Sequence, residues 1–451
     1  MHNPKELKNK VVDTTCLRIG SNFEGIASLD GYTLFINDAL PGEDLQVRIE
    51  KCEKNYGYAK VLKRKNNSEY RVEPACKHYA QCGGCSCEHI EYNFALEQKS
   101  KMVTDCFKKY AKLDIQVPLT KGLDNPWNAR NKTSLPIRDH YGEIQIGFYK
   151  KRSHNIVNVE QCPIAHPQVL NAIKALRVWM EENNVRAYNE FTGKGALRHI
   201  VVRNNKKDEL MIVLVSTQKS LPNIEALITK FQKEVKGFVS LYLNINTKRD
   251  NVIMGYQNHL LYGQEVLQQD LLGLQFEISP LSFMQVNSQL TDVLYQTAID
   301  MANINKNDIC VDAYAGAGTI SLIMARQCKE VVGIEIIKDA VKNAERNAEN
   351  NHITNASFIC GTVEETLPKL VEEKKITILL LDPPRKGVEQ GVIDAIAAAM
   401  PAKIVYISCN PATQARDVNL MVQLGYSVQA SQPIDMFSMT AEVENVMLLT
   451  K

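Results

Sequence analysis

The chain has 451 residues, which is too many for one hydrophobic core, so we expect two or three domains. Its formal net charge is only +2, so any affinity for nucleic acid has to come from local basic patches. The polar start MHNPKELKNK excludes a signal peptide and no apolar run reaches the roughly 18 residues of a membrane span, so we expect a cytoplasmic protein whose 12 cysteines serve packing, metal binding or catalysis.

Residues 1–68 are predicted to form a small β-barrel. Short segments of alternating apolar and polar residues, such as YTLFIND and DLQVRIEKCEK, are separated by the turn sequences LDG and LPGED. Basic residues interleaved with tyrosines follow, an arrangement found on RNA-binding surfaces and also on plain solvated faces. These residues are Lys51, Lys54, Lys60, Lys63, Arg64, Lys65 and Arg71, with Tyr56, Tyr58 and Tyr70.

Residues 69–265 form the second predicted unit, which begins with a cysteine-rich segment. CKHYAQCGGC places Cys76, Cys82 and Cys85 in a C-x5-C-x2-C pattern, which is not the C-x3-C-x2-C pattern of radical S-adenosylmethionine enzymes. A closed metal site needs a fourth ligand, and Cys87 is awkwardly close to Cys85. The pattern leaves a four-cysteine zinc site and an iron–sulfur cluster open.

A helix over 91–113 and a mixed α/β region over 120–265, with helices at 167–184 and 222–235, complete this unit. Each basic residue here is ordinary on its own, but together they predict a positive wall that contacts RNA phosphates. The candidates are Arg130, Lys132, Lys150, Lys151, Arg152, Arg198 and His199.

Residues 266–451 alternate strands and helices regularly from about residue 280. Strands are predicted at 330–335, 356–360, 376–384 and 403–409, with helices at 318–327, 337–350, 388–399 and 412–423. This alternation indicates a parallel, doubly wound α/β sheet, in which ligands bind at the carboxyl ends of the strands. Glu335, Asp382 and Cys409 stand at such ends.

Two sequences at these strand ends indicate a cofactor site. VDAYAGAGT supplies Gly316 and Gly318 after the first strand, and Glu335 ends the next strand, where an acid accepts hydrogen bonds from a ribose. No P-loop lysine is present, which leaves a nicotinamide dinucleotide or S-adenosylmethionine. LLDPPRKG favours the second, because it resembles the signature loop of S-adenosylmethionine-dependent methyltransferases; Arg385 stands where amino-group methyltransferases carry an aromatic residue.

The motifs PLSFMQVN, VDAYAGAGT, VVGIE, LLDPPRKG, YISCNPAT and MFSMTAEVENV, in this order, resemble the RNA uracil-C5 methyltransferases. The resemblance implies a Rossmann-like S-adenosylmethionine methyltransferase domain, and the N-terminal barrel resembles the TRAM domain of the members that modify 23S ribosomal RNA. It also implies that Cys162 joins Cys76, Cys82 and Cys85 in a [4Fe–4S] cluster of structural or RNA-positioning role. The implied S-adenosylmethionine contacts are Gln285, Tyr314, Thr319, Glu335, Thr362 and Asp382.

Cys409 and Glu444 are the predicted catalytic pair. Carbon 5 of uracil becomes nucleophilic when a thiolate adds to carbon 6, and a carboxylate then has to remove the C5 proton. Cys409 fits the first role, and the resemblance gives Glu444 the second, with Glu442 as a rival two residues away. We expect a monomer that acts on a single-stranded or loop uridine.

Three alternatives stay open at this point. The substrate could be transfer RNA, or the chain could be a non-catalytic RNA-binding protein. An RNA cytosine-C5 methyltransferase is disfavoured by the absence of a Pro-Cys-Ser sequence.

Overall fold

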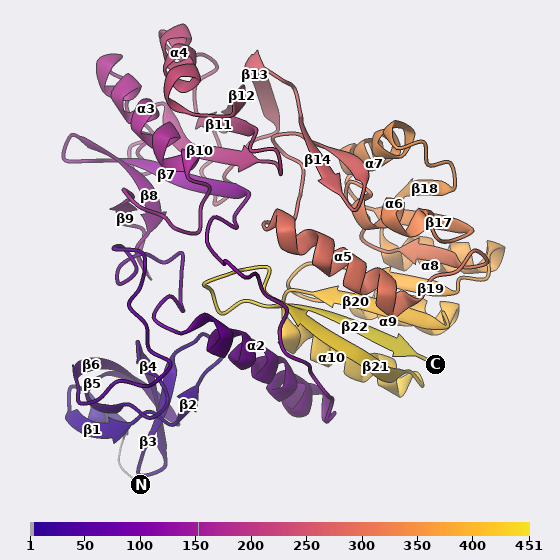
Figure 1. Ribbon diagram of the computed structural model, residues 1–451, viewed down its shortest axis with the longest axis horizontal. Helices are drawn as coiled ribbons and strands as arrows, with labels where there is room; N and C mark the ends of the chain where they lie inside the picture. Colours follow the sequence, from indigo (N-terminus) through magenta and orange to yellow (C-terminus); the bar gives the residue numbers. More distant parts are fainter. Residues whose placement is uncertain (1–3, 152) are drawn as a thin grey trace.

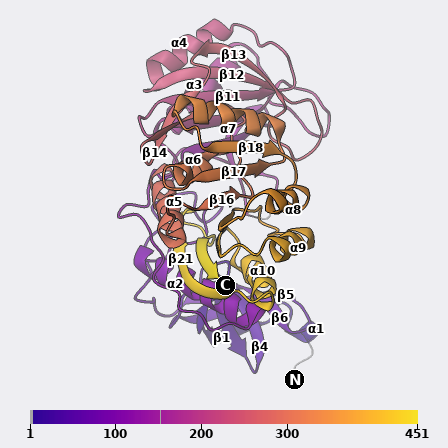
Figure 2. The ribbon, with the colours of Figure 1, turned by 90° about the vertical axis from the view of Figure 1, so that its right-hand side faces the viewer.

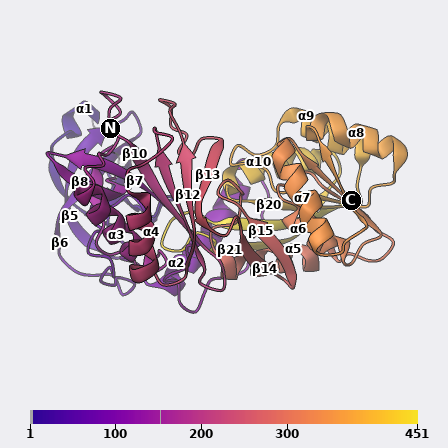
Figure 3. The same ribbon diagram turned by 90° about the horizontal axis from the view of Figure 1, so that it is seen from above.

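Three β-sheets and a separate hairpin organise the protein, seen here in a computed structural model that describes residues 4–151 and 153–451 (Figure 1). A six-stranded N-terminal sheet and a seven-stranded central sheet form one side of the molecule, and a seven-stranded C-terminal sheet forms the other (Figure 3). No helix in this described part of the chain is long and apolar enough to cross a membrane.

The N-terminal sheet follows a four-residue helix, α1 (Pro4–Leu7), and has the order β1-β5-β6-β4-β3-β2. β1 contacts β3 as well as β5, so the sheet curls on itself as the predicted barrel requires. Leu34, Ile36, Leu45, Val47 and Ile49 fill its interior, because alternate residues of each strand face the same side. The strands are β1 (Val11–Thr15), β2 (Arg18–Ile19), β3 (Gly25–Leu29), β4 (Tyr32–Asn37), β5 (Asp44–Cys52) and β6 (Tyr56–Arg64).

The cysteine-rich segment leads into α2 (Tyr92–Cys106), which continues as a π-helical turn (Phe107–Ala111). Glu91 caps α2 by accepting hydrogen bonds from the backbone N–H groups of Asn93 and Phe94. The helix packs against the C-terminal sheet, on β21 (Ser427–Ile434) and α10 (Pro411–Gln423) (Figure 1).

The central sheet has the order β13-β12-β11-β10-β7-β8-β9, and only β11 and β12 run parallel. Two helices, α3 (Gln168–Glu182) and α4 (Ile224–Glu234), cover one face and bury Trp179 against it. The strands are β7 (Lys132–His140), β8 (Glu143–Tyr149), β9 (Ile156–Asn158), β10 (Leu197–Asn204), β11 (Leu210–Ser216), β12 (Phe238–Ile245) and β13 (Gln257–Gly263). A hairpin of β14 (Leu267–Leu271) and β15 (Leu274–Ile278) follows.

The C-terminal sheet has the order β18-β17-β16-β19-β20-β22-β21, and β16 to β20 are parallel, as predicted. These five strands are β16 (Ile309–Asp312), β17 (Glu330–Glu335), β18 (Ala356–Cys360), β19 (Ile378–Leu381) and β20 (Lys403–Ser408). Its helices are α5 (Ser288–Ala302), α6 (Thr319–Ala325), α7 (Lys338–Asn350), α8 (Val363–Glu373), α9 (Gln390–Ala399) and α10 (Pro411–Gln423).

The last two strands, β21 (Ser427–Ile434) and β22 (Glu444–Thr450), were not predicted. β22 enters between β20 and β21 and runs antiparallel to both. Its amino end therefore lies at the same edge of the sheet as the carboxyl ends of the parallel strands (Figure 1). Figure 2 shows three of the parallel strands, β16, β17 and β18, side by side in that order.

Candidate active site

The carboxyl edge of the C-terminal sheet brings the two predicted catalytic residues together. Ser408 at the end of β20 pairs with Asn445 near the start of β22, so the next residues, Cys409 and Glu444, are neighbours across the two strands. Charges on Glu444, Asp382 and Arg385 all act on the Cys409 thiol. One edge of one sheet therefore holds the thiol, two carboxyl groups and a guanidinium.

Cys409 is half-buried, and its surroundings disfavour the thiolate in the ligand-free protein. Burial, together with the charge of Glu444, raises the pKa of the Cys409 thiol to about 11. The Arg385 guanidinium opposes this shift because its positive charge favours the thiolate. Asn410, which follows at once, caps α10 by accepting from the backbone N–H groups of Ala412 and Thr413, and so fixes the turn that carries the thiol.

Glu444 and Glu442 have different environments. Glu442 is partly exposed and forms an ion pair with Arg385, with 2.5 Å between Oε1 and Nη2. Glu444 is buried with 2% of its surface exposed, and burial and the charge of Asp382 raise its pKa well above the usual range. β22 begins at Glu444, so Glu442 lies just before the strand.

Two aspartates at the ends of neighbouring strands add to the acidic character of the edge. Asp312, at the end of β16, is fully buried and accepts a hydrogen bond from Ser321 Oγ at 2.5 Å. Burial raises the pKa of Asp312 to about 6. The pKa of Asp382 is raised to about 7, mainly by burial and to a smaller extent by the charge of Asp312. A cationic ligand would favour the charged forms of these carboxyl groups.

The glycine turn between β16 and α6 opens toward the same edge. Gly316 and Gly318 have positive φ angles of 54° and 78°, and an added Cβ on Gly316 would meet no atom within 4 Å. Glu335 holds the turn, since its Oε2 accepts from Gly316 N at 3.0 Å and its Oε1 from Ile337 N at 2.7 Å. Each carboxylate oxygen has further lone pairs, so the residue can also accept from a ligand hydroxyl.

The other predicted cofactor residues lie around this turn. Thr319 begins α6 and its hydroxyl lies 3.3 Å from the Tyr295 hydroxyl of α5. Tyr314 lies within the turn, and burial raises the pKa of its hydroxyl. Thr362 precedes α8 as its cap residue. Gln285 is buried in the segment before α5, where its backbone oxygen accepts from Asn131 Nδ2 at 2.8 Å.

A buried ion pair that sequence reasoning missed anchors the segment leading to Glu444. Lys99 of α2 pairs with Asp435, and both side chains are almost completely buried. Tyr92 donates to the second oxygen of Asp435 at 2.6 Å. Lys99 falls on the apolar face of α2, four residues after Ala95 and four before Val103, and a lysine at such a position needs a buried partner.

The cysteine-rich segment touches the same part of the chain. The backbone N–H groups of Ser86 and Cys87 donate to the carbonyl oxygen of Met439, and Figure 1 shows this C-terminal loop reaching across to the N-terminal half. Cys87 also lies 3.6 Å from the carbonyl oxygen of Thr440, and its side chain packs in an apolar cluster with Phe94. Cys87 is therefore a packing residue, away from the other cysteines of its segment.

The four predicted metal ligands line one small cavity, together with Phe148 and Glu88. Burial raises the pKa of all four thiols, that of Cys162 to about 11. Within the described residues, however, no group of three or more His, Cys, Asp or Glu side chains is arranged to hold a metal ion. The structure thus brings the cysteines Cys76, Cys82, Cys85 and Cys162 to one place without confirming a metal site.

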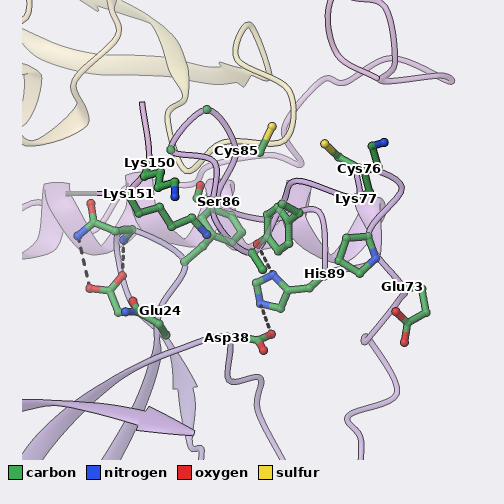
Figure 4. A pocket seen from close by; sticks show the side chains of 18 of the residues that line it. Glu24, Asp38, Glu73, Cys76, Lys77, Cys85, Ser86, His89, Lys150 and Lys151 are labelled. Atoms are coloured by element: carbon green, nitrogen blue, oxygen red, sulfur yellow. Dashed lines mark hydrogen bonds and ion pairs between the residues drawn. The ribbon is translucent and has the colours of Figure 1, made fainter. Parts of the chain in front are cut away.

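A wide cleft separates the N-terminal sheet from the central sheet, with a volume of about 1530 Å³. Lys150 and Lys151 extend along one wall, and Asp38 and His89 lie on the other (Figure 4). Lys151 also lies over the Tyr79 ring, 4.6 Å from its centroid. The cleft is large enough for an extended polymer strand and is lined by polar and aromatic groups suited to one.

Several residues of the predicted RNA-binding surface after the barrel are engaged within the protein. Arg64 and Arg71 pair with the buried Glu43 and with Asp38. Tyr70 stacks on Phe94 with ring centroids 3.7 Å apart. The basic surface is therefore less charged than the sequence indicated.

Two of the phosphate contacts predicted in the central unit are not on the surface of the protein. Arg198 and His199 are buried, so they do not form an outer positive wall. Arg152 lies outside the described residues.

Two family models and several proteins of other organisms are similar to this chain. A family model described as tRNA (Uracil-5-)-methyltransferase matches residues 91–451, and one described as TRAM domain matches residues 5–62. A Clostridium tetani protein named uncharacterized RNA methyltransferase is 40% identical over 445 residues, which cover 98% of this chain and 97% of the relative. A protein of the same name from Enterococcus faecalis is 40% identical over 454 residues, covering 100% and 99%.

One solved structure matches nearly the whole chain. It is the tRNA (uracil-54, C5)-methyltransferase of Pyrococcus abyssi in complex with S-adenosyl-L-homocysteine, with a TM-score of 0.78 and 26% identity. The match covers 97% of this chain and 99% of that chain.

Proposed function

This chain belongs to the tRNA (uracil-5-)-methyltransferase family, and we propose that it transfers a methyl group from S-adenosylmethionine to carbon 5 of a uridine in RNA. The observation that carries the proposal is the pairing of β20 with β22, which sets the Cys409 thiol beside the Glu444 carboxyl group at the ligand edge of the sheet. The similarity to a methyltransferase solved with S-adenosyl-L-homocysteine supports the choice of cofactor.

We assign the nucleophile to Cys409. Its sulfur forms a bond to carbon 6 of the uracil, and the electron pair of the 5,6 double bond moves into an enolate over carbon 5 and the C4 oxygen. Arg385 supports this step because its positive charge favours the thiolate. Bound S-adenosylmethionine supplies an electrophilic methyl group and a positive charge that favours the thiolate and carboxylate forms nearby. The electron pair of the enolate forms the bond from carbon 5 to the methyl carbon, while the bond from that carbon to the sulfonium sulfur breaks and S-adenosyl-L-homocysteine leaves.

We assign the removal of the proton from carbon 5 to Glu444. Its carboxylate accepts the proton from carbon 5, the 5,6 double bond re-forms, and the Cys409 thiolate leaves carbon 6. Glu444 is favoured over Glu442 because Glu442 is already engaged by Arg385. Burial also raises the proton affinity of Glu444, which suits a group that must take a proton from carbon.

The cofactor residues of the proposal surround the glycine turn. Glu335 and the backbone of Gly316 suit the ribose, and Asp382 lies between that turn and Cys409 in the order of the strands. Gln285, Tyr314, Thr319 and Thr362 complete the set that we propose for S-adenosylmethionine. The exposed flank of Gly316 supports close approach of a ligand to the backbone.

A [4Fe–4S] cluster on Cys76, Cys82, Cys85 and Cys162 belongs to the proposal as well. The support is that these four thiols line one cavity although Cys162 is 77 residues beyond Cys85 in the chain. A zinc ion on the same four sulfurs is the weaker alternative, because the sequence resemblance implies a cluster. When bound, a cluster would cross-link the cysteine-rich segment to the central sheet. Iron and sulfide analysis of anaerobically purified protein, with zinc measured alongside, tests this part.

The RNA substrate is proposed as 23S ribosomal RNA, with transfer RNA as the second candidate. The barrel and the cysteine motif favour the first by resemblance. The second is favoured by the Pyrococcus abyssi structure, because a tRNA enzyme matches this chain over 97% of its length, N-terminal sheet included. We propose that the enzyme acts as a monomer on an unpaired uridine, since the base has to leave its stack to reach Cys409.

One experiment tests the function directly. The purified protein is incubated with labelled S-adenosylmethionine and, in parallel, with 23S ribosomal RNA and transfer RNA from cells that lack the enzyme. We expect 5-methyluridine in one of the two, and a covalent complex with the same RNA carrying 5-fluorouridine, because fluorine in place of the C5 proton blocks its removal. Absence of both product and complex would contradict the proposal.

A further inference from the structure

A second cavity lies on the central sheet, apart from the catalytic edge. It has a volume of about 600 Å³, within the range of about 300–1,000 Å³ that small-molecule sites occupy. None of the residues proposed for catalysis or for the cofactor lines it. Phe148, Tyr149 and Ser153 line both this cavity and the wide cleft beside the N-terminal sheet, so the two are adjoining spaces.

The floor of the cavity is formed by neighbouring strands of the central sheet. His199 of β10 pairs with Pro136 of β7, so their side chains lie on the same face, and β7 pairs in turn with β8. On β8, Tyr149 shares that face, whereas Phe148 packs toward the core under α3 and α4 and reaches the cavity at the end of the strand. The adjacent residue Ile200 belongs to the core under α3 and α4. The cavity therefore occupies the face of the sheet opposite to the helices.

Within the floor, one polar group is left without a partner. His199 is 7% exposed and lines the cavity, and its Nδ1 atom has no hydrogen-bond partner among the described residues. Burial and the charges of Arg138 and Arg198 lower the pKa of the His199 ring to about 3, so the ring is neutral and offers one donor and one acceptor. Buried polar groups without partners are rare, and a site that awaits a ligand is one explanation for them.

Arg198 is held by contacts within the protein, so its guanidinium stiffens the floor and is not free to bind an anion. Its guanidinium donates to the backbone oxygens of Asn246 and Lys248, at 3.0 and 2.6 Å, and lies 5.1 Å from the centroid of the Tyr188 ring. These contacts join β10 to the loop after β12, which forms one side of the mouth. The lining thus combines aromatic rings, a neutral imidazole and fixed backbone with the carboxylates of Glu190 and Asp250, which suits a flat heterocycle better than a phosphate.

The mouth of the cavity carries groups that suit a nucleic acid strand. Arg249 is exposed there, and Val252 and Ile253 form an apolar rim. Phe191, which follows the lining residue Glu190, is 96% exposed. Exposed aromatic rings beside cations are the elements that hold single strands by stacking and by phosphate contact.

We propose that this cavity binds a second unpaired nucleobase of the RNA substrate, read by the ring of His199, while the strand continues through the adjoining cleft past Lys150 and Lys151. This inference rests on the proposed function, since it takes RNA as the substrate. The base is distinct from the target uracil, because the cavity contains no residue of the catalytic edge. The site would add sequence selectivity at a nucleotide flanking the target.

The test measures binding, so that it stands apart from methylation. Four short single-stranded RNA oligonucleotides, one of each base, are titrated against the full chain and the variants His199→Phe and Arg249→Ala. The control is Arg186→Ala, an exposed arginine of the same unit that does not line the cavity. Salt is varied in each titration.

We expect wild-type protein to prefer one base, and His199→Phe to weaken binding of that oligonucleotide by about threefold to tenfold, as for one hydrogen bond, while the other three change little. Arg249→Ala is expected to weaken all four similarly and to lower the salt dependence, as loss of a phosphate contact does. Arg249 is exposed, so this arm does not depend on the core. Arg186→Ala should bind like wild type.

Equal binding of all four oligonucleotides by wild type, or unchanged binding by both variants, would overturn the proposal. Preference for a free nucleoside over every oligonucleotide would also overturn it, because the occupant would then not be RNA. Either result leaves the methylation and trapping assays unaffected, so failure of this site and failure of the proposed function can be told apart.

Discussion

The central and C-terminal sheets each have seven strands, but they present their side chains in different ways. In the C-terminal sheet, β16 to β20 are parallel, so their carboxyl ends meet at one edge, and β22 adds its amino end there. In the central sheet only β11 and β12 are parallel, so strand ends of both kinds alternate along each edge. The C-terminal sheet therefore brings polar side chains together at one edge, whereas the central sheet presents its polar side chains on a face.

The difference is also electrostatic. At the catalytic edge, burial raises the pKa of Cys409, Asp382 and Glu444, so the ligand-free site holds protons that a cationic ligand would help to displace. On the face of the central sheet, burial lowers the pKa of His199 and leaves it neutral. The first environment suits the proton and group transfer proposed for it, and the second suits the proposed recognition of a base.

The largest expected effect is at the nucleophile. Cys409→Ala should lower the rate of 5-methyluridine formation by at least about a thousandfold, because the covalent route is lost. Cys360→Ala is the matched control, since it removes an exposed thiol at the end of β18 in the same sheet. Nucleoside analysis of digested RNA measures both, and near-normal product from Cys409→Ala would break the assignment of chemistry to this edge.

Glu444→Gln should come next, with a rate reduced by about 10²–10⁴-fold, the range for loss of a general base. The methylated RNA adduct on Cys409 should accumulate, because the C5 proton is no longer removed, and denaturing gels detect it. Glu442→Gln removes the partner of Arg385 and should have a smaller effect with no adduct. The reverse pattern would transfer the base role to Glu442.

Lys99→Met tests how far the catalytic edge depends on α2. It leaves Asp435 buried without its cation, which should lower the free energy of unfolding by about 3–5 kcal/mol. Lys101→Met, an exposed change on the same helix, should have little effect. Chemical denaturation measures both, and adding Asp435→Asn to Lys99→Met should recover part of the loss. Equal stability of the Lys99 and Lys101 variants would mean that the buried pair does not anchor this segment.

The smallest expected effect is the pH dependence caused by Asp382. Its pKa is raised to about 7, so the folded protein keeps a proton that the unfolded chain releases above about pH 4, and stability falls as pH rises through this window. Asp382→Asn should therefore raise the free energy of unfolding by about 1–2 kcal/mol at pH 5 and leave it unchanged at pH 3. Asp394→Asn, on the exposed side of α9, is the control. A gain that is equal at both pH values would rule out the titration as its cause.

Much of the C-terminal domain follows from its pattern. The apolar run before Asp382 and the one before Cys409 are too continuous for a half-exposed strand, and the helices between them have clear periodicity. β21 was missed because SVQASQPI is mostly small and polar, and its strand conformation comes from pairing with β22. The position of β22 beside β20 depends on that same pairing.

The surface was harder to predict than the core. Arg198 and His199 look like RNA contacts in the sequence, since both are polar and lie near other basic residues. The sheet buries them, and the backbone oxygens of Asn246 and Lys248 satisfy Arg198. A linear sequence gives no sign of carbonyl oxygens that come from a loop some fifty residues away.

The sequence by itself determined the alternation of strands and helices, the cofactor turn and the identity of Cys409 as a thiol at a strand end, because these depend on residues close together in the chain. Tertiary structure alone decided which acid faces Cys409, how Lys99 and Asp435 meet, and that His199 lines a cavity. Cys409 and Glu444, like Lys99 and Asp435, are more than thirty positions apart in the chain, whereas Glu442 and Glu444 are near neighbours that differ in burial. Such choices follow from strand register and from the cost of burying charge, which only the folded chain sets.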